Sequence, residues 1–125
     1  MLKQLILVGI GGGIGSMLRY LTSFWIHKSF PTLLFPLATF MVNITGCLII
    51  GLLAGLASKH VLFNNELRFL LVTGFCGGYT TFSTFSAENF TLFEKGHYAI
   101  LVAYILGSII IGILAFYLGY QTTKN

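Results

Sequence analysis

"GGYTTFSTFSAENF", residues 77–90, is a polar stretch within a very hydrophobic sequence. It carries six hydroxyl side chains, one carboxylate and three phenylalanines. The whole chain has 125 residues, of which 56% are hydrophobic and only 8% are charged, and its mean hydropathy is +0.90. Charged residues make up about 25% of an ordinary soluble domain. The composition therefore predicts an integral membrane protein, with this stretch at membrane depth.

Around this stretch, the apolar residues fall into four runs that are separated by short polar segments. The runs cover residues 4–26, 35–57, 67–93 and 98–120. The polar segments are 28–32, 58–66 and 94–97. Each run is long enough to cross a hydrocarbon layer of ~30 Å, which requires about 20 helical residues. The sequence predicts an all-α protein with four transmembrane helices, forming a single transmembrane domain over residues 1–125.

The middle of the third run favours a break in its helix. Three glycines, Gly74, Gly77 and Gly78, precede Thr80 and Thr81. Glycine weakens a helix by about 1 kcal/mol relative to alanine, and β-branched threonine adds little support. Irregular backbone at membrane depth is tolerated where protein buries it or where it lines a hydrated cavity, and its carbonyls can coordinate a small cation. The alternative is a continuous helix whose glycines serve packing.

Beyond the predicted break, Phe82 and Phe85 lie three positions apart and alternate with hydroxyl groups from Ser83 and Thr84. An aromatic ring has a negative face and a positive edge. Rings presented edge-on could therefore hold a small anion weakly enough to release it, as conduction requires. The alternative is that these phenylalanines only pack the protein core.

Other polar residues inside the apolar runs are candidates for the same pathway. A buried Asn43 amide is costly unless it is paired, so it is expected to donate to an anion or to a partner helix. Tyr104 and Ser108 are four residues apart and share one helical face. Arg19 is an intramembrane charge, which marks a functional-site candidate, although near a helix end it could extend to the membrane surface. Glu88 is the one carboxylate well inside a run.

The positive charges divide weakly between the two sides of the membrane. Four helices place both termini on one side, which collects Lys3, Lys59, Arg68 and Lys124. The other side has Lys28 and Lys95, with Arg19 inside the first helix toward it. Orientation follows the bias of lysine and arginine in short loops. A single orientation is the ordinary expectation from such a pattern, but insertion in both orientations with antiparallel pairing remains open.

Several classes of function are not expected. The three histidines lie at membrane boundaries, so no cluster has the spacing of a metal site. Glu88 has no second carboxylate beside it, and the serines have no nearby base that would make one of them a nucleophile. The positive charge is spread over helix ends and forms no nucleic-acid surface. We expect neither an enzyme nor a nucleic-acid partner.

Three motifs resemble the Fluc/CrcB family of bacterial fluoride channels. They are "GGIGSMLRY" (12–20), "TFMVNITGCLIIG" (39–51) and "GFCGGYTTFSTFSAE" (74–88). The resemblance extends over essentially the whole chain, and the third motif is the most specific. Ser16 and Ala38 stand where the family pattern has alanine and glycine, which concerns packing more than function.

The resemblance implies a multi-pass protein of the bacterial inner membrane that exports fluoride from the cytoplasm passively and relieves its toxicity. It implies an antiparallel, dual-topology homodimer with two pores along the interface, which replaces the expectation of a single orientation. A structural sodium ion is implied at the centre of the dimer, held by the backbone carbonyls of Gly77 and Thr80 from both subunits.

The family pattern also assigns residues to the fluoride pathway. Phe82 and Phe85 match rings whose edges face fluoride, and Asn43 matches the polar residue beside them. The hydroxyl members implied along the pathway are Ser83, Thr84, Tyr104 and Ser108. Arg19 matches an arginine of the first helix, and Arg19 and Glu88 are assigned an electrostatic or structural role.

Two other functions remain as alternatives. A small multidrug or guanidinium-type cation exporter resembles this chain in size and charge bias, but that class requires a carboxylate in its first helix, where this chain has only Arg19. A non-conducting membrane assembly subunit is the second alternative. Substitution of Phe82 or Phe85 separates these cases, because a packing role predicts altered assembly and a pore role predicts lost flux.

Overall fold

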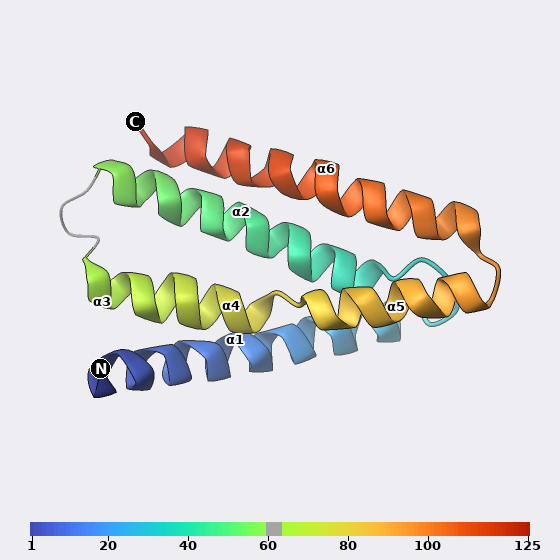
Figure 1. Ribbon diagram of the computed structural model, residues 1–125, viewed down its shortest axis with the longest axis horizontal. Coiled ribbons are helices and arrows are strands. Elements are labelled where there is room, and N and C mark those ends of the chain that lie inside the picture. The colour runs from blue at the N-terminus through green and yellow to red at the C-terminus, as the bar shows by residue number, and fades with distance from the viewer. Residues whose placement is uncertain (60–63) are drawn as a thin grey trace.

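The computed structural model describes residues 1–59 and 64–125, in which every regular element is a helix (Figure 1). Part of the polar segment 58–66 lies outside the described residues. Three helices are long and apolar enough to cross a membrane: α1 (Leu2–Ser29), α2 (Leu37–Lys59) and α6 (Tyr98–Thr123). The chain is therefore a multi-pass membrane protein, with both termini at the same end of its bundle (Figure 1).

The segment that the sequence predicts as the third of four crossings is built from several short helices. It begins with α3 (Asn65–Leu67), where the Asn64 side chain accepts a hydrogen bond of 3.0 Å from the Leu67 N–H. It continues as the π-helix η1 (Arg68–Cys76) and α4 (Gly77–Tyr79), and then as α5 (Phe82–Glu94). Two extended residues, Thr80 and Thr81, separate α4 from α5. The π-helix is a difference from the sequence analysis, which does not predict one.

α1 packs along η1 and α4 at very short range. A Cβ atom on Gly11 would collide with the Leu70 carbonyl, and one on Gly15 would collide with the Phe75 carbonyl. Small residues of this kind let the backbones of membrane helices approach each other. The α1 interface therefore depends on the absence of side chains at two positions one turn apart.

α2 and α6 form a second close pair, and they run side by side in Figure 1. A Cβ atom on Gly51 would collide with the Phe116 carbonyl, and one on Gly119 would lie 2.6 Å from the Leu48 carbonyl. The bundle is thus two tightly packed pairs, α1 with η1 and α4, and α2 with α6. The junction between α4 and α5 lies where these pairs meet.

Gly74, Gly77 and Gly78 lie in helical backbone, and Gly74 and Gly78 pack closely against α1. Gly77 has φ −63° and ψ −36°, and Gly78 lies within α4. A Cβ on Gly74 would lie 2.9 Å from the Val8 carbonyl, and one on Gly78 would collide with the Gly12 carbonyl. The sequence predicts the helix break from the glycines and threonines together. In the structure only the threonines are extended, because α1 holds the glycine backbone in its helical form.

A glycine with a positive φ angle ends α5. Gly96 has φ 76°, a left-handed conformation that glycine adopts without strain. Its N–H donates to the Phe93 carbonyl at 3.1 Å, and the His97 N–H donates to the Leu92 carbonyl at 2.9 Å. These two bonds are the Schellman pattern of a helix C-terminus. They turn the chain back into α6 within a few residues.

Candidate functional site

The junction between α4 and α5 is held by the two threonines themselves. The N–H and the Oγ1 of Thr80 both donate to the Cys76 carbonyl, at 3.0 and 2.9 Å. The Thr81 hydroxyl caps α5 by accepting from the Thr84 N–H at 3.3 Å. In a continuous α-helix the Thr84 N–H would donate to the Thr80 carbonyl. The Thr80 carbonyl is therefore released from its helical donor.

Asn43 of α2 binds the backbone of Thr81 through both ends of its amide. Its Oδ1 accepts from the Thr81 N–H at 2.9 Å, and its Nδ2 donates to the Thr81 carbonyl at 3.1 Å. In a continuous helix the Thr81 N–H would donate to the Gly77 carbonyl. This pairing satisfies a polar side chain at membrane depth, and it releases the Gly77 carbonyl from its helical donor.

Both neighbouring helices also contact the junction. A Cβ atom on Gly46 of α2 would collide with the Thr80 methyl group, so this glycine leaves room for the threonine side chain. The Ser16 hydroxyl of α1 donates to the Gly78 carbonyl at 3.5 Å, a long bond. The junction thus lies between α1 and α2, and each contributes polar contacts to it.

An aromatic row extends from the surface of the bundle into its core. Phe82 is 78% exposed, and its ring centroid lies 5.8 Å from that of Phe85. The Phe85 ring lies 4.8 Å from Tyr104, which is fully buried, and the Tyr104 ring lies 5.4 Å from Phe35. Phe82, at the start of α5, is therefore the member of the row that this chain leaves uncovered.

Glu88 links three helices through hydrogen bonds from two hydroxyl groups. Tyr104 of α6 donates to its Oε1 at 2.8 Å, and Thr39 of α2 donates to its Oε2 at 3.0 Å. Each carboxylate oxygen thus has a donor, which offsets the cost of placing this group inside the bundle. The cluster fixes the position of α5 relative to α2 and α6.

We expect Tyr104→Phe to lower the free energy of unfolding by about 1–3 kcal/mol, because it leaves one carboxylate oxygen of Glu88 without its donor while keeping the ring contacts. Tyr98→Phe is the matched control, since Tyr98 is on the same helix and is 57% exposed. Thermal unfolding in detergent measures both. Equal midpoints for the two variants would contradict a structural role for the Tyr104 hydroxyl.

The remaining predicted hydroxyl groups differ in their surroundings. Ser83 and Thr84 are exposed on the first turn of α5, where their hydroxyls lie 3.4 and 3.2 Å from the Thr81 Oγ1. The Oγ of Ser108 is buried, and among the described residues it has no hydrogen-bond partner. Three hydroxyls therefore gather at the start of α5, while Ser108 keeps a free polar atom on α6.

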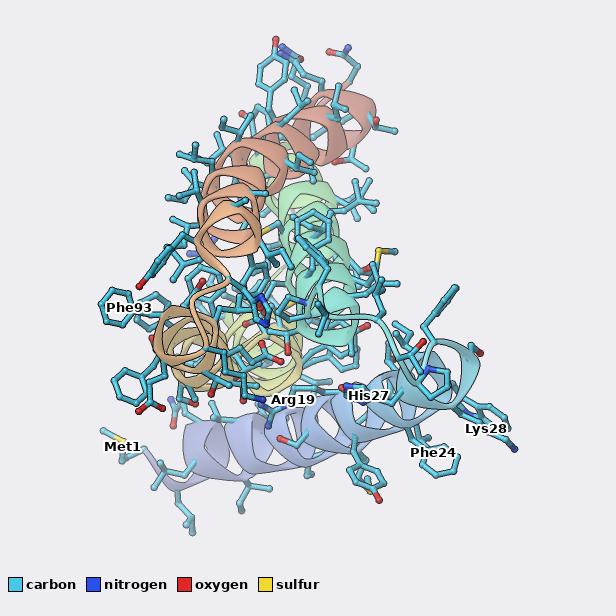
Figure 2. The ribbon with its side chains drawn as sticks, turned by 90° about the vertical axis from the view of Figure 1, so that its right-hand side faces the viewer. Met1, Arg19, Phe24, His27, Lys28 and Phe93 are labelled. Atoms are coloured by element: carbon cyan, nitrogen blue, oxygen red, sulfur yellow. The ribbon has the colours of Figure 1, made fainter. Side chains whose placement is uncertain are left out.

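Two recesses open beside this region. The smaller, of about 220 Å³, is lined by Arg19, Ser23, Thr39, Thr81 and Thr84, among others. Figure 2 shows Arg19 on the side of α1 that faces the other helices. Within residues 1–59 and 64–125, Arg19 forms no ion pair, so its charge contributes an uncompensated positive potential to this recess.

The larger recess, of about 520 Å³, lies toward the turn between α5 and α6. It is lined by Glu88, Lys95, His27 and His97, together with mostly apolar residues of the segment 30–38. Thr84 lines both recesses. In the part of the chain that the structure describes, no three histidine, cysteine, aspartate or glutamate side chains gather as a metal site.

Most of the residues that the sequence singles out belong to one of two contact networks, one centred on Thr81 and one on Tyr104. Asn43, Ser83 and Thr84 meet at Thr81, whereas Phe82, Phe85 and Glu88 connect through Tyr104. Arg19 and Ser108 belong to neither network among the described residues. Thr39 and Gly46 contact this region but are not predicted as site residues, and Thr81 is predicted only as part of the helix break. Thr39, Asn43 and Gly46 are spaced i, i+4, i+7, a pattern that places them on one helical face.

Similarity to known proteins extends over nearly the whole chain. Residues 6–120 match the family described as CrcB-like protein, Camphor Resistance (CrcB). The chain is 50% identical over 124 residues to a protein of Azobacteroides pseudotrichonymphae genomovar. CFP2 named "Fluoride-specific ion channel FluC", with 99% of this chain and 98% of that protein covered. Proteins of the same name from Flavobacterium psychrophilum (46% over 124 residues; 99% of each chain) and Methylobacillus flagellatus (46% over 121 residues; 97% and 94%) are also similar.

Proposed function

Because the chain belongs to the CrcB family, we propose that it is a passive channel selective for fluoride. The observation that carries this proposal is the exposed Phe82 ring beside the hydroxyl cluster at the junction of α4 and α5. Such a surface combines positive ring edges with O–H donors, which can replace part of the water around a small anion. The similar proteins are named as fluoride-specific channels, which supports fluoride as the ion.

The proposed pathway is formed by residues of α2, α5 and α6. Its residues are Asn43, Phe82, Ser83, Thr84, Phe85, Tyr104 and Ser108. Arg19 would raise the local concentration of anions at the smaller recess, because its positive charge attracts them. The Ser108 hydroxyl has no partner in the part of the chain that the structure describes, so it is a donor that an anion could use without breaking a bond there.

We further propose that two copies assemble as an antiparallel, dual-topology homodimer in the bacterial inner membrane. The nearly even distribution of lysine and arginine between the two ends of the bundle supports insertion in both orientations. Exposed Phe82 would then face the second copy and not lipid, so the pathway would run along the interface between subunits.

The carbonyls of Gly77 and Thr80 fit the requirements of a structural sodium ion. Both have lost their helical donors, since the Thr81 N–H donates to Asn43 and the Thr84 N–H donates to Thr81. Carbonyl oxygens released from broken membrane helices are suitable ligands for Na⁺. When bound, the ion would supply positive charge to otherwise unpaired oxygens of both copies.

Passive conduction is sufficient for export. Moving one charge through a membrane potential of 100 mV releases ~2.3 kcal/mol, so the potential of a cell drives an anion outward without coupling to another reaction. A selective pore would in this way remove fluoride from the cytoplasm and relieve its toxicity.

Fluoride efflux from liposomes that contain the purified protein tests this function. An ionophore clamps the voltage, chloride replaces fluoride in the control, and protein-free liposomes give the background leak. We expect rapid fluoride loss with negligible chloride loss. Absence of fluoride efflux from a well-folded protein would contradict the proposal, and transport of guanidinium in the same liposomes would then favour a cation exporter.

A further inference from the structure

The amide of Asn43 is engaged with the protein, although its type and depth suit an anion contact. Its Oδ1 accepts from the Thr81 N–H at 2.9 Å and its Nδ2 donates to the Thr81 carbonyl at 3.1 Å. These two residues are 38 positions apart, and both groups that Asn43 binds belong to the backbone. The Asn43 side chain therefore supplies the hydrogen-bond partners of the extended Thr81 backbone, as a neighbouring strand would.

We propose that Asn43 is a positioning residue for the sodium site, in addition to any contact with fluoride. This inference rests on the sodium site proposed above. The Thr81 N–H is the group that would close the helix onto the Gly77 carbonyl. By accepting that N–H, the Asn43 Oδ1 keeps the Gly77 carbonyl free to bind a cation.

The surroundings of Asn43 support this role. Gly46 lies three residues further along α2, on the same face, and leaves room for the Thr80 methyl group. The same face of α2 therefore fixes Thr80 by shape and Thr81 by hydrogen bonds. A helix can adopt its regular form wherever a competing partner is absent, so removing the amide should allow α4 to extend by one residue.

The Asn43 amide has a second N–H that the Thr81 carbonyl does not use. Nδ2 carries two donors, and the Thr81 carbonyl uses one of them. The other remains available to an anion, so a change in fluoride flux alone would not identify the positioning role. The positioning role is identified by how protein stability depends on Na⁺ concentration, because only this role changes the affinity of the cation site.

Three variants separate the contributions. Asn43→Leu keeps a similar volume and removes both hydrogen bonds. Asn43→Asp retains an oxygen acceptor for the Thr81 N–H and removes the donor. Thr45→Val is the matched control, since Thr45 is a polar residue of α2 that lies about 200° around the helix from Asn43.

The measurement is the thermal unfolding midpoint of the full-length protein in detergent, as a function of Na⁺ concentration, with choline keeping the ionic strength constant. We expect Asn43→Leu to raise the Na⁺ concentration for half-maximal stabilisation by about tenfold or more, the factor that corresponds to losing one or two hydrogen bonds. Asn43→Asp should raise it less than Asn43→Leu does, and Thr45→Val should leave it unchanged.

A purely structural role for Asn43 would lower the midpoint equally at every Na⁺ concentration, and this result would overturn the inference. Wild-type protein without any response to Na⁺ would instead overturn the sodium site itself, while fluoride efflux tests the channel separately. Should Asn43→Leu fail to fold, Asn43→Ser decides by the same criterion, because its short side chain also loses contact with Thr81.

Discussion

Replacing Phe82 with alanine will reduce fluoride efflux by at least about tenfold, equal to ~1.4 kcal/mol in the barrier to conduction, and will leave the fold of the subunit intact. The ring is 78% exposed, and among residues 1–59 and 64–125 its ring contact is with Phe85. Its removal therefore forfeits little buried apolar area, whereas the proposed pathway loses the first ring that meets the ion.

Phe93→Ala is the control for this experiment. Phe93 lies on the same helix and is 58% exposed, but it packs on Tyr98 near the turn into α6 and outside the proposed pathway. The position of Phe93 on the outside of the bundle can be followed in Figure 2. Liposome efflux gives the rate, and size-exclusion chromatography gives the assembly state. Wild-type flux from Phe82→Ala, or disrupted assembly with it, would favour a packing role for this ring.

The second large effect concerns Gly15 of α1, with Gly13 as its comparison. We expect Gly15→Ala to destabilise the protein by roughly 2–3 kcal/mol, because an added methyl group would force the backbone of η1 and α4 to move. Its Cβ would collide with the Phe75 carbonyl and would lie 2.9 Å from the Tyr79 nitrogen. The displacement would reach Thr80 directly, so fluoride efflux should fall as well.

Gly13→Ala provides the comparison, since a Cβ atom there would meet nothing within 4 Å. The same change in helix propensity, about 1 kcal/mol in favour of alanine, applies to both substitutions. Thermal unfolding at one protein concentration then isolates the effect of the close backbone contact. Similar midpoints for the two variants would show that α1 can withdraw from η1 at little cost.

The parts of this structure that the sequence predicts well are those that depend on local composition. Three apolar runs form continuous helices because hydropathy is a property of neighbouring residues. The hydroxyl groups of Thr81, Ser83 and Thr84 lie near one another because their spacing places them within one turn. Phe82 and Phe85 lie in ring contact for the same reason.

The parts that it does not predict depend on contacts between distant residues. The pairing of Asn43 with Thr81 joins positions 38 apart, and neither residue alone indicates its partner. The hydrogen bonds of Glu88 with Thr39 and Tyr104 have the same character. Glycine spacing also indicates close approach without saying which helix approaches, so the helical state of Gly78 depends on α1 and not on its own preference.

The released carbonyls of Gly77 and Thr80 make the stability of this protein depend on its concentration in the membrane, under the proposed assembly. Backbone oxygens that stay unpaired at membrane depth cost several kcal/mol each. Under the proposed assembly, a second copy and its cation remove the penalty, so the folded state gains free energy from mass action. The stability of this chain is then a function of its ratio to lipid, and dilution in the membrane acts on it as a denaturant does on a soluble protein.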